Sequence, residues 1–164
     1  MKRMLGEINM FKELARQGKQ ISDDLVVKLL QQGEYGVLST IGPNGYPYGV
    51  PLSYAYVDKA IYFHCAIAGH KLDNIAYNQS ASFCVVNKAV TLPNKFTVSY
   101  ESVILYGKAS EVIDTDEKYQ ALLALVEKYA SDYIESGKKY IKNDMHKTKV
   151  IKIEIEKVIG KKSN

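Results

Sequence analysis

Apolar and polar residues alternate along six segments of the chain, and this period of two predicts β-strands. The predicted strands cover residues 35–40, 46–57, 60–66, 81–90, 95–112 and 150–159. The last segment alternates most regularly, with Ile151, Ile153 and Ile155 on one face. The segment over 95–112 is long enough to bend near Gly107. The Asn-Gly pair at 44–45 predicts a tight hairpin turn between the first two strands.

Other segments carry apolar residues at the spacing of a helix. A helix is predicted between Ser22, as its N-cap, and a terminating Gly33. A second follows Gly69, and a third starts at Asp114 or Thr115. The apolar faces of these helices comprise Leu25, Val26, Leu29 and Leu30; Leu72, Ile75 and Ala76; and Tyr119, Leu122, Leu123, Val126 and Tyr129. A further helical piece is expected over 132–141, and residues 1–20 are expected to form a short arm or helix.

The pattern as a whole predicts one mainly β domain over residues 1–164. About six antiparallel strands, tight hairpins and a few peripheral helices indicate a small closed barrel. Strands that alternate with helical crossovers would indicate a doubly wound sheet, and that pattern is absent from the sequence.

Composition narrows the class of protein. With 164 residues, 46% hydrophobic and 24% charged, the chain has the make-up of a globular domain. The net charge of +4 comes largely from lysines near the C-terminus, which we interpret as a solvated face rather than a nucleic-acid surface. No apolar run is long enough to span a bilayer and no export signal is recognisable, so a cytoplasmic protein is expected. Cys65 and Cys84 are expected to be free thiols, and no metal site is predicted.

The segment around Gly69-His70-Lys71 predicts an anion site. A strand, a short turn and a helix follow one another here, and the N–H groups at the start of a helix favour an anion. His70 and Lys71 oppose the helix dipole, so they are poor choices for helix stability alone. A phosphate held between these side chains and the backbone explains their placement.

The predicted second strand contains residues that do not suit a central strand. Pro51 cannot donate a ladder hydrogen bond, so this stretch lies at an edge, at a bulge or beside another group; a plain barrel corner would also explain it. Gly49 permits close approach to the backbone. Together with the anion site, this surface suits a flat heterocycle that carries a phosphate, which describes flavin mononucleotide (FMN).

Five segments in this order carry a family resemblance: residues 35–38 (YGVL), 45–54 (GYPYGVPLSY), 61–66 (IYFHCA), 69–71 (GHK) and 82–85 (SFCV). They are similar to the pyridoxamine 5′-phosphate oxidase-like FMN-binding split barrels, and within these to the nitroimidazole-resistance (Nim-type) branch. Residues 10–14 and 153–161 also resemble that branch. The resemblance implies a six-stranded antiparallel split β-barrel and a homodimer with FMN at the subunit interface.

The resemblance also implies roles for particular residues. A strand segment would run along the isoalloxazine ring, and it comprises Tyr48, Gly49, Val50, Pro51, Leu52 and Ser53. His64, Cys65 and Ala66 would border the ribityl chain, and His70 with Lys71 would hold the phosphate. Ser102 matches a serine that reaches the cofactor. The residue before it, Glu101, stands where the family often has arginine, which puts an anion-binding role there in doubt.

His64 has two interpretations. It could be an inert histidine at a barrel rim, or it could lie beside the flavin and donate a proton to a bound substrate; the resemblance favours the second. The expected function is an FMN-dependent oxidoreductase that reduces small electron-poor compounds such as nitro compounds. The alternatives are a non-catalytic flavin-binding or flavin-sensing module, a haem- or deazaflavin-using relative, and a nucleic-acid-binding barrel. Pyridoxamine 5′-phosphate oxidase activity itself is disfavoured, because the resemblance implies a C-terminal segment with tryptophan and arginine for the substrate phosphate in that branch, and this chain has no tryptophan.

Overall fold

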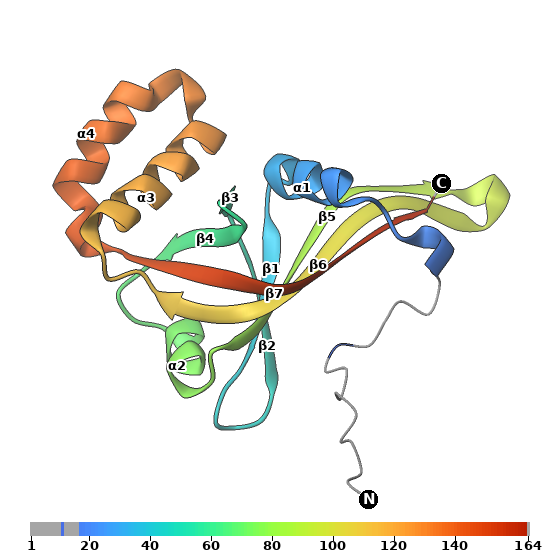
Figure 1. Cartoon of the computed structure of the whole chain (residues 1–164), viewed down its shortest axis with the longest axis horizontal. Helices are drawn as coiled ribbons and strands as arrows, with labels where there is room; N and C mark the ends of the chain where they lie inside the picture. The colour runs from blue at the N-terminus through green and yellow to red at the C-terminus, as the bar shows by residue number, and fades with distance from the viewer. Residues whose placement is uncertain (1–10, 12–16, 164) are drawn as a thin grey trace, which may run out of the picture.

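The computed structural model describes residue 11 and residues 17–163 of the chain. Its strands are β1 (Gly36–Ile41), β2 (Pro47–Leu52), β3 (Ala55–Val57), β4 (Ala60–Cys65), β5 (Ser80–Leu92), β6 (Thr97–Glu111) and β7 (Lys149–Ser163). Its α-helices are α1 (Asp23–Gln32), α2 (His70–Tyr77), α3 (Thr115–Tyr129) and α4 (Ile134–Asp144). The α3–α4 pair lies at one end of the molecule, and the hairpin of β5 and β6 extends from the other (Figure 1).

The described strands form a single antiparallel sheet of seven strands in the order β2-β1-β5-β6-β7-β4-β3. The predicted six-stranded closed barrel is therefore wrong, because β2 and β3 are the two edges and do not pair with each other. Only Ser53 and Tyr54 separate these edges along the chain, so the sheet must curl to bring them together. The edges meet without a ladder because the Tyr54 backbone is bonded elsewhere: its N–H donates to the Tyr129 hydroxyl at 3.0 Å, and its carbonyl accepts from the same group at 3.0 Å.

The predicted strand over 46–57 is thus two strands that belong to opposite edges of the sheet. β2 pairs with β1, and β3 pairs with β4. The expectation that Pro51 lies at an edge is confirmed, since β1 is the only strand that pairs with β2 among the described residues. An edge strand tolerates the missing N–H of a proline.

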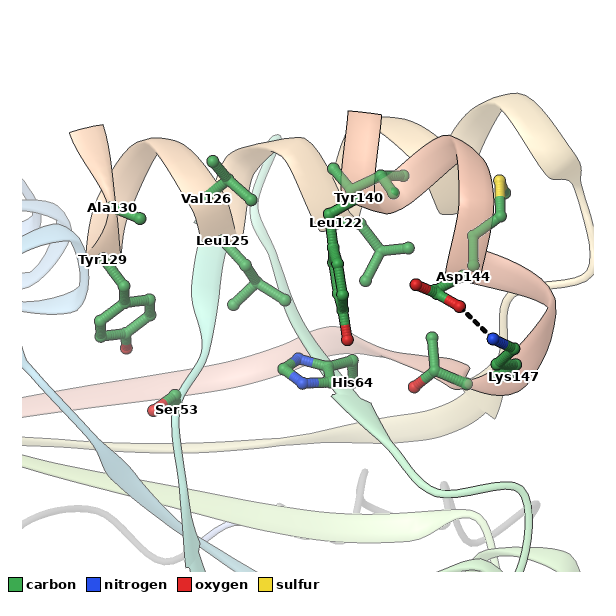
Figure 2. A pocket seen from close by; sticks show the side chains of 13 residues that line it. Ser53, His64, Leu122, Leu125, Val126, Tyr129, Ala130, Tyr140, Asp144 and Lys147 are labelled. Carbon is green, nitrogen blue, oxygen red and sulfur yellow. Dashed lines mark hydrogen bonds and ion pairs between the residues drawn. The ribbon is translucent and has the colours of Figure 1, made fainter. Parts of the chain in front are cut away.

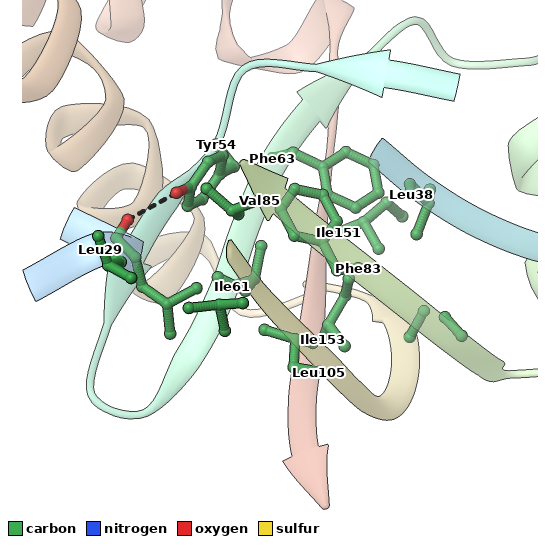
Figure 3. Packing of buried hydrophobic residues seen from close by; sticks show 14 of the residues in the cluster. Leu29, Leu38, Tyr54, Ile61, Phe63, Phe83, Val85, Leu105, Ile151 and Ile153 are labelled. Carbon is green, nitrogen blue, oxygen red and sulfur yellow. Dashed lines mark hydrogen bonds between the residues drawn. The ribbon is translucent and has the colours of Figure 1, made fainter. Parts of the chain in front are cut away.

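The main core fills the concave side of the curled sheet (Figure 3). Large side chains from five strands and from α1 are fully buried there, among them Leu29, Leu38, Tyr54, Ile61, Phe63, Phe83, Leu105 and Ile153. The Tyr54 hydroxyl donates to the carbonyl of Leu30 at 2.7 Å and so ties α1 to this core. Gly33 ends α1 as predicted, but its φ of −61° is not left-handed. Glycine is needed there for space, because a Cβ would lie 2.4 Å from Val85 Cγ1.

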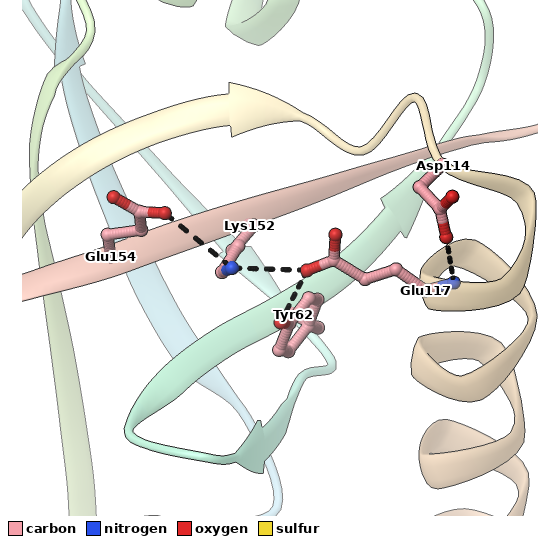
Figure 4. Close-up of polar contacts among 5 residues, drawn as sticks. All are labelled: Tyr62, Asp114, Glu117, Lys152 and Glu154. Atoms are coloured by element: carbon pink, nitrogen blue, oxygen red, sulfur yellow. Dashed lines mark hydrogen bonds and ion pairs between the residues drawn. The ribbon is translucent and has the colours of Figure 1, made fainter.

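A second core lies between the convex face of β4 and the α3–α4 pair. Ala60 and Tyr62 of β4 belong to it, whereas Ile61 and Phe63 belong to the main core, so β4 is buried on both faces. A polar network fixes the start of α3 to the sheet (Figure 4). The Tyr62 hydroxyl donates to Glu117 Oε1 at 2.8 Å, and Lys152 Nζ lies 3.1 Å from the same oxygen.

Several local predictions are confirmed. Asp114 caps α3 by accepting from Glu117 N at 2.8 Å. The register of β6 against β7 shifts between Tyr106 and Gly107, at the predicted bend. β5 and β7 are longer than predicted, because they continue along the part of the sheet that projects beyond β1, whereas β6 begins and ends within its predicted range. Residues 1–10 and 12–16 of the predicted arm lie outside the described residues. Within the described part, no helix combines the length and apolar character needed to cross a membrane.

Candidate functional site

The predicted anion site opens α2. Gly69 has a φ of +146°, a conformation that glycine adopts without strain. His70 is exposed and Lys71 half-buried in the first turn. Burial raises the pKa of the nearby Cys65 thiol, and the positive charge of Lys71 acts against this shift. The end of β4 and the start of α2 therefore share one electrostatic environment, with a cation available to a bound anion.

A buried hydrogen bond holds α2 against β1. Asn74 Nδ2 donates to Thr40 Oγ1 at 3.1 Å, and both residues are almost completely buried. Thr40 is the register partner of Tyr48 in β2. His70 lies one helical turn before Asn74, and its ring packs against the Tyr48 ring with centroids 4.2 Å apart. The fold thus brings the start of β2 and the start of α2 together.

The convex side of β2 presents a flat exposed surface. Tyr48, Val50 and Leu52 are half-buried, while Gly49 and Pro51 on the opposite side are exposed. Exposed Ser53 continues the strand. A Cβ at Gly49 would meet only Val37 Cγ1, at an ordinary 3.6 Å, so packing within the chain does not require glycine. We call the exposed surface of Gly49, Pro51 and Ser53 the shelf.

The end of β4 carries the other predicted residues. His64 is exposed on the convex side, Cys65 is half-buried against the main core, and Ala66 is exposed just beyond the strand. Thr148 Oγ1 donates to the Cys65 carbonyl at 2.6 Å and joins this end to the residue before β7. Strand alternation therefore separates His64 from Cys65, as predicted.

His64 and Ser53 line one pocket of about 750 Å³ between the sheet and the helices α3 and α4 (Figure 2). We call it the helical pocket. Its other lining residues are Leu122, Leu125, Val126, Tyr129, Ala130, Tyr140, Ile141, Asp144, Met145, Lys147 and Thr148. Tyr140 extends from α4 toward the side on which His64 lies (Figure 2). The pocket therefore has apolar walls on the helices and polar groups toward the sheet.

Ser102 is not brought to this region within one chain. It pairs with Lys161 of β7, whereas Cys65 pairs with Lys149 of the same strand. These partners are twelve positions apart, which corresponds to about 40 Å of strand. Ser102 is therefore far from the end of β4, whereas its connection to the shelf is shorter: it pairs with Val86 of β5, and β5 is linked through β1 to β2.

Sequence reasoning missed the helical wall of the pocket. The apolar positions Leu122, Val126 and Tyr129 were correctly placed on one face of α3, but they were expected only to pack in a core. The spacing of a helix shows that such a face is covered and does not show by what. A surplus of apolar positions over those needed to contact β4 would have been the available signal.

The fold is a mainly β antiparallel sheet with peripheral helices; the shelf and the helical pocket lie on its convex side, and the predicted anion site opens α2, which packs on the face of Thr40 and Tyr48. The chain belongs to the pyridoxamine 5′-phosphate oxidase family, whose sequence model matches residues 22–162. The predicted family resemblance is confirmed. A comparison with curated protein sequences gave no match.

Solved structures share the fold at low sequence identity. A conserved hypothetical protein from Mycobacterium tuberculosis is 20% identical, with 93% of this chain and 90% of that chain covered and a TM-score of 0.78. A candidate 5-nitroimidazole antibiotic resistance protein from Bacteroides thetaiotaomicron is 20% identical, with coverage of 85% and 83% and a TM-score of 0.70. An FAD- and haem-binding protein from Mycobacterium smegmatis is 18% identical, with coverage of 89% and 74% and a TM-score of 0.77.

Proposed function

We propose that this protein binds FMN on the shelf, with the phosphate at the start of α2. The observation that carries the proposal is the contact between Tyr48 and His70, because it joins the strand expected along the flavin ring to the turn expected at its phosphate. The binding of FAD by the related protein from M. smegmatis supports a flavin. The family membership favours the mononucleotide.

The residues present fit such a cofactor. Lys71 and His70 offer donors to a phosphate, and the exposed backbone at Gly49 and Pro51 leaves room for a flat ring. Ser53 and His64 line the helical pocket beyond the shelf, where the ring would end. Cys65 and Ala66, which follow His64 in the sequence and precede the turn into α2, would border the ribityl chain.

The proposed activity is the reduction of small electron-poor compounds such as nitro compounds. Bound FMN would supply the redox chemistry, while the protein supplies binding, orientation and electrostatics. His64 is the residue placed to donate a proton to a substrate, because its exposed imidazole lines the helical pocket. The resemblance to the protein from B. thetaiotaomicron supports a nitro substrate.

We further propose a homodimer in which Ser102 of the partner subunit reaches the flavin. Apolar side chains are exposed along the projecting β5–β6 hairpin: Val86, Val90, Phe96 and Val98. A second copy would cover this surface and would bring its own Ser102 toward the flavin. Light scattering should give twice the 18.4 kDa chain mass, and a monomer that still retains FMN would reject the shared site.

A flavin titration of purified protein tests the cofactor. We expect absorption bands of about one flavin per chain and a Kd that rises about 10- to 100-fold in Lys71→Ala, because a charge-assisted contact is lost. Lys28→Ala is the matched control, because it removes an exposed positive charge on α1. Equal affinities of the two variants would reject the phosphate site, and a wild-type protein that retains no flavin would reject the function.

The role of His64 is tested separately. His64→Ala should lower the rate of nitro-compound reduction more than it lowers flavin affinity. An unchanged rate would leave His64 without a part in turnover. A wild-type holoprotein that reduces no electron acceptor would instead support the flavin-binding or flavin-sensing alternative.

Haem is the second candidate ligand. An imidazole at the edge of a pocket with apolar walls is the usual arrangement of an axial haem ligand, and His64 has this position. Titration with haemin should then give an intense Soret band that is lost in His64→Ala. The flavin proposal predicts no such dependence on His64.

A further inference from the structure

The helical pocket is nearly neutral although it is built in a lysine-rich part of the chain. Among its described lining residues, the acidic and basic side chains of fixed charge are Asp144 and Lys147, and these two form an ion pair with each other. The Tyr129 hydroxyl is engaged with the backbone carbonyl of Glu34 at 2.6 Å. A phosphate ester is bound best by unpaired cations, and the lysine that lines this pocket is paired with Asp144.

The walls of the pocket favour an apolar ring instead. Leu122, Leu125 and Val126 of α3 form one side, and the Tyr140 ring enters from α4 (Figure 2). The volume of about 750 Å³ lies in the upper part of the range for drug-sized ligands. Aromatic side chains pack well on the faces and edges of flat rings, so fused rings use this space better than a small polar molecule does.

We propose that the helical pocket binds the second ligand of the flavin site, an uncharged compound of two or three fused rings. The position of this ligand beside the flavin rests on the proposed function, but its binding to the pocket does not. His64 and Ser53 would meet the edge of the ring that faces the shelf, and α3 would cover its apolar part. The family name describes oxidation of a phosphorylated amine, whereas the charge balance of this pocket selects against such an anion.

Equilibrium dialysis with flavin-free protein tests this proposal. The probes are 1-nitronaphthalene and 5-nitronaphthalene-1-sulfonate, which share a ring system and differ in one negative charge. We expect the neutral probe to bind at least ten-fold more tightly. Equal or tighter binding of the sulfonate would overturn the proposal, and so would displacement of the neutral probe by FMN, because the pocket would then be part of the flavin's own site.

Variants of pocket residues test where the neutral probe binds. Ala130→Phe should fill the pocket and weaken 1-nitronaphthalene binding at least ten-fold, whereas Gln120→Phe, at an exposed position of the same helix α3, should leave it unchanged. Tyr140→Ala removes a side chain that is 68% exposed and therefore tests the pocket without risk to the core; we expect about five-fold weaker binding. Wild-type affinity in Tyr140→Ala and in folded Ala130→Phe would place the probe elsewhere and overturn the proposal.

The charge balance has its own test. Asp144→Asn leaves Lys147 without its acidic partner, so the preference for the neutral probe should fall about three-fold, the effect of an exposed charge. An unchanged preference would show that this ion pair does not set the selection and would overturn the electrostatic part of the proposal. Because all these measurements use flavin-free protein, a failure of flavin binding is seen separately in the FMN titration.

Discussion

The buried amide of Asn74 donates to the hydroxyl of Thr40 and thereby aligns the start of α2 with the start of β2. Thr40 pairs with Tyr48 across the β1–β2 hairpin, and His70 lies one turn before Asn74 and packs against the Tyr48 ring. One polar bond therefore sets the relative position of the proposed phosphate site and the proposed ring site. Neither Asn74 nor Thr40 is expected to touch a ligand.

Asn74→Ala should destabilise the protein by about 2 kcal/mol, because Thr40 keeps a buried hydroxyl without its partner. Chemical denaturation measures this loss. FMN affinity should fall several-fold as α2 loses its alignment. The control is Asn78→Ala, which removes an exposed acceptor for Ser80 N and should cost less in stability. If Asn74→Ala lowers stability but keeps wild-type affinity, the bond does not position the site.

Tyr129→Phe should lower the free energy of unfolding by about 1–2 kcal/mol. The hydroxyl of Tyr129 is hydrogen-bonded to the N–H and the carbonyl of Tyr54, at the point where the two sheet edges meet. Phenylalanine leaves these two backbone groups without that partner. Tyr133→Phe, at a residue that is 69% exposed, is the matched control. Equal midpoints of thermal unfolding in the two variants would contradict the importance of this link.

Gly49→Ala should keep the fold and weaken FMN binding about ten-fold. The added Cβ meets only ordinary contact with Val37, so the free energy of unfolding should change by less than about 0.5 kcal/mol. The methyl group would instead occupy the shelf. Gly107→Ala is the contrasting variant, because its Cβ would lie 2.0 Å from the carbonyl oxygen of Glu154 and should disrupt the β6–β7 ladder. If Gly49→Ala binds flavin as tightly as the wild type, the flavin ring does not lie on the shelf.

Lys128 should lower the free energy of unfolding by an amount that depends on pH. Its ammonium is buried without a hydrogen-bond partner among the described residues and lies 3.7 Å from the centroid of the Tyr54 ring. Burial lowers the pKa of Lys128 to about 8. Above this pH the native state releases a proton that the unfolded state retains up to about 10.5, so this group makes stability rise with pH.

Lys128→Met removes that titration. The variant should be more stable than the wild type at pH 7, and the difference in unfolding free energy should shrink between pH 8 and 9.5. Denaturant titrations of both proteins at matched pH values measure this difference. Other groups that titrate in the same range contribute equally to both proteins, so their contributions cancel. A difference that is constant over this interval would contradict the lowered pKa of Lys128.

The local elements of this protein could be predicted from the sequence because each depends on neighbouring residues. The alternation of Ile151, Ile153 and Ile155, the cap at Asp114 and the turn before His70 all specify backbone conformation within a few positions. The residue types at the candidate site could be predicted for the same reason. Cations in the first turn of α2 and a proline in β2 are unusual for stability and therefore point to a ligand or an edge.

Only the tertiary structure decided how these elements meet. The pattern over 46–57 gave no indication that β2 and β3 belong to opposite edges, because Tyr54 leaves the strand through bonds to Tyr129, which is 75 residues away in the sequence. The wall of the helical pocket has the same origin. The apolar face of α3 would look alike whether it covered β4 alone or also enclosed a cavity, since local periodicity records that a side chain is buried and long-range packing decides what buries it.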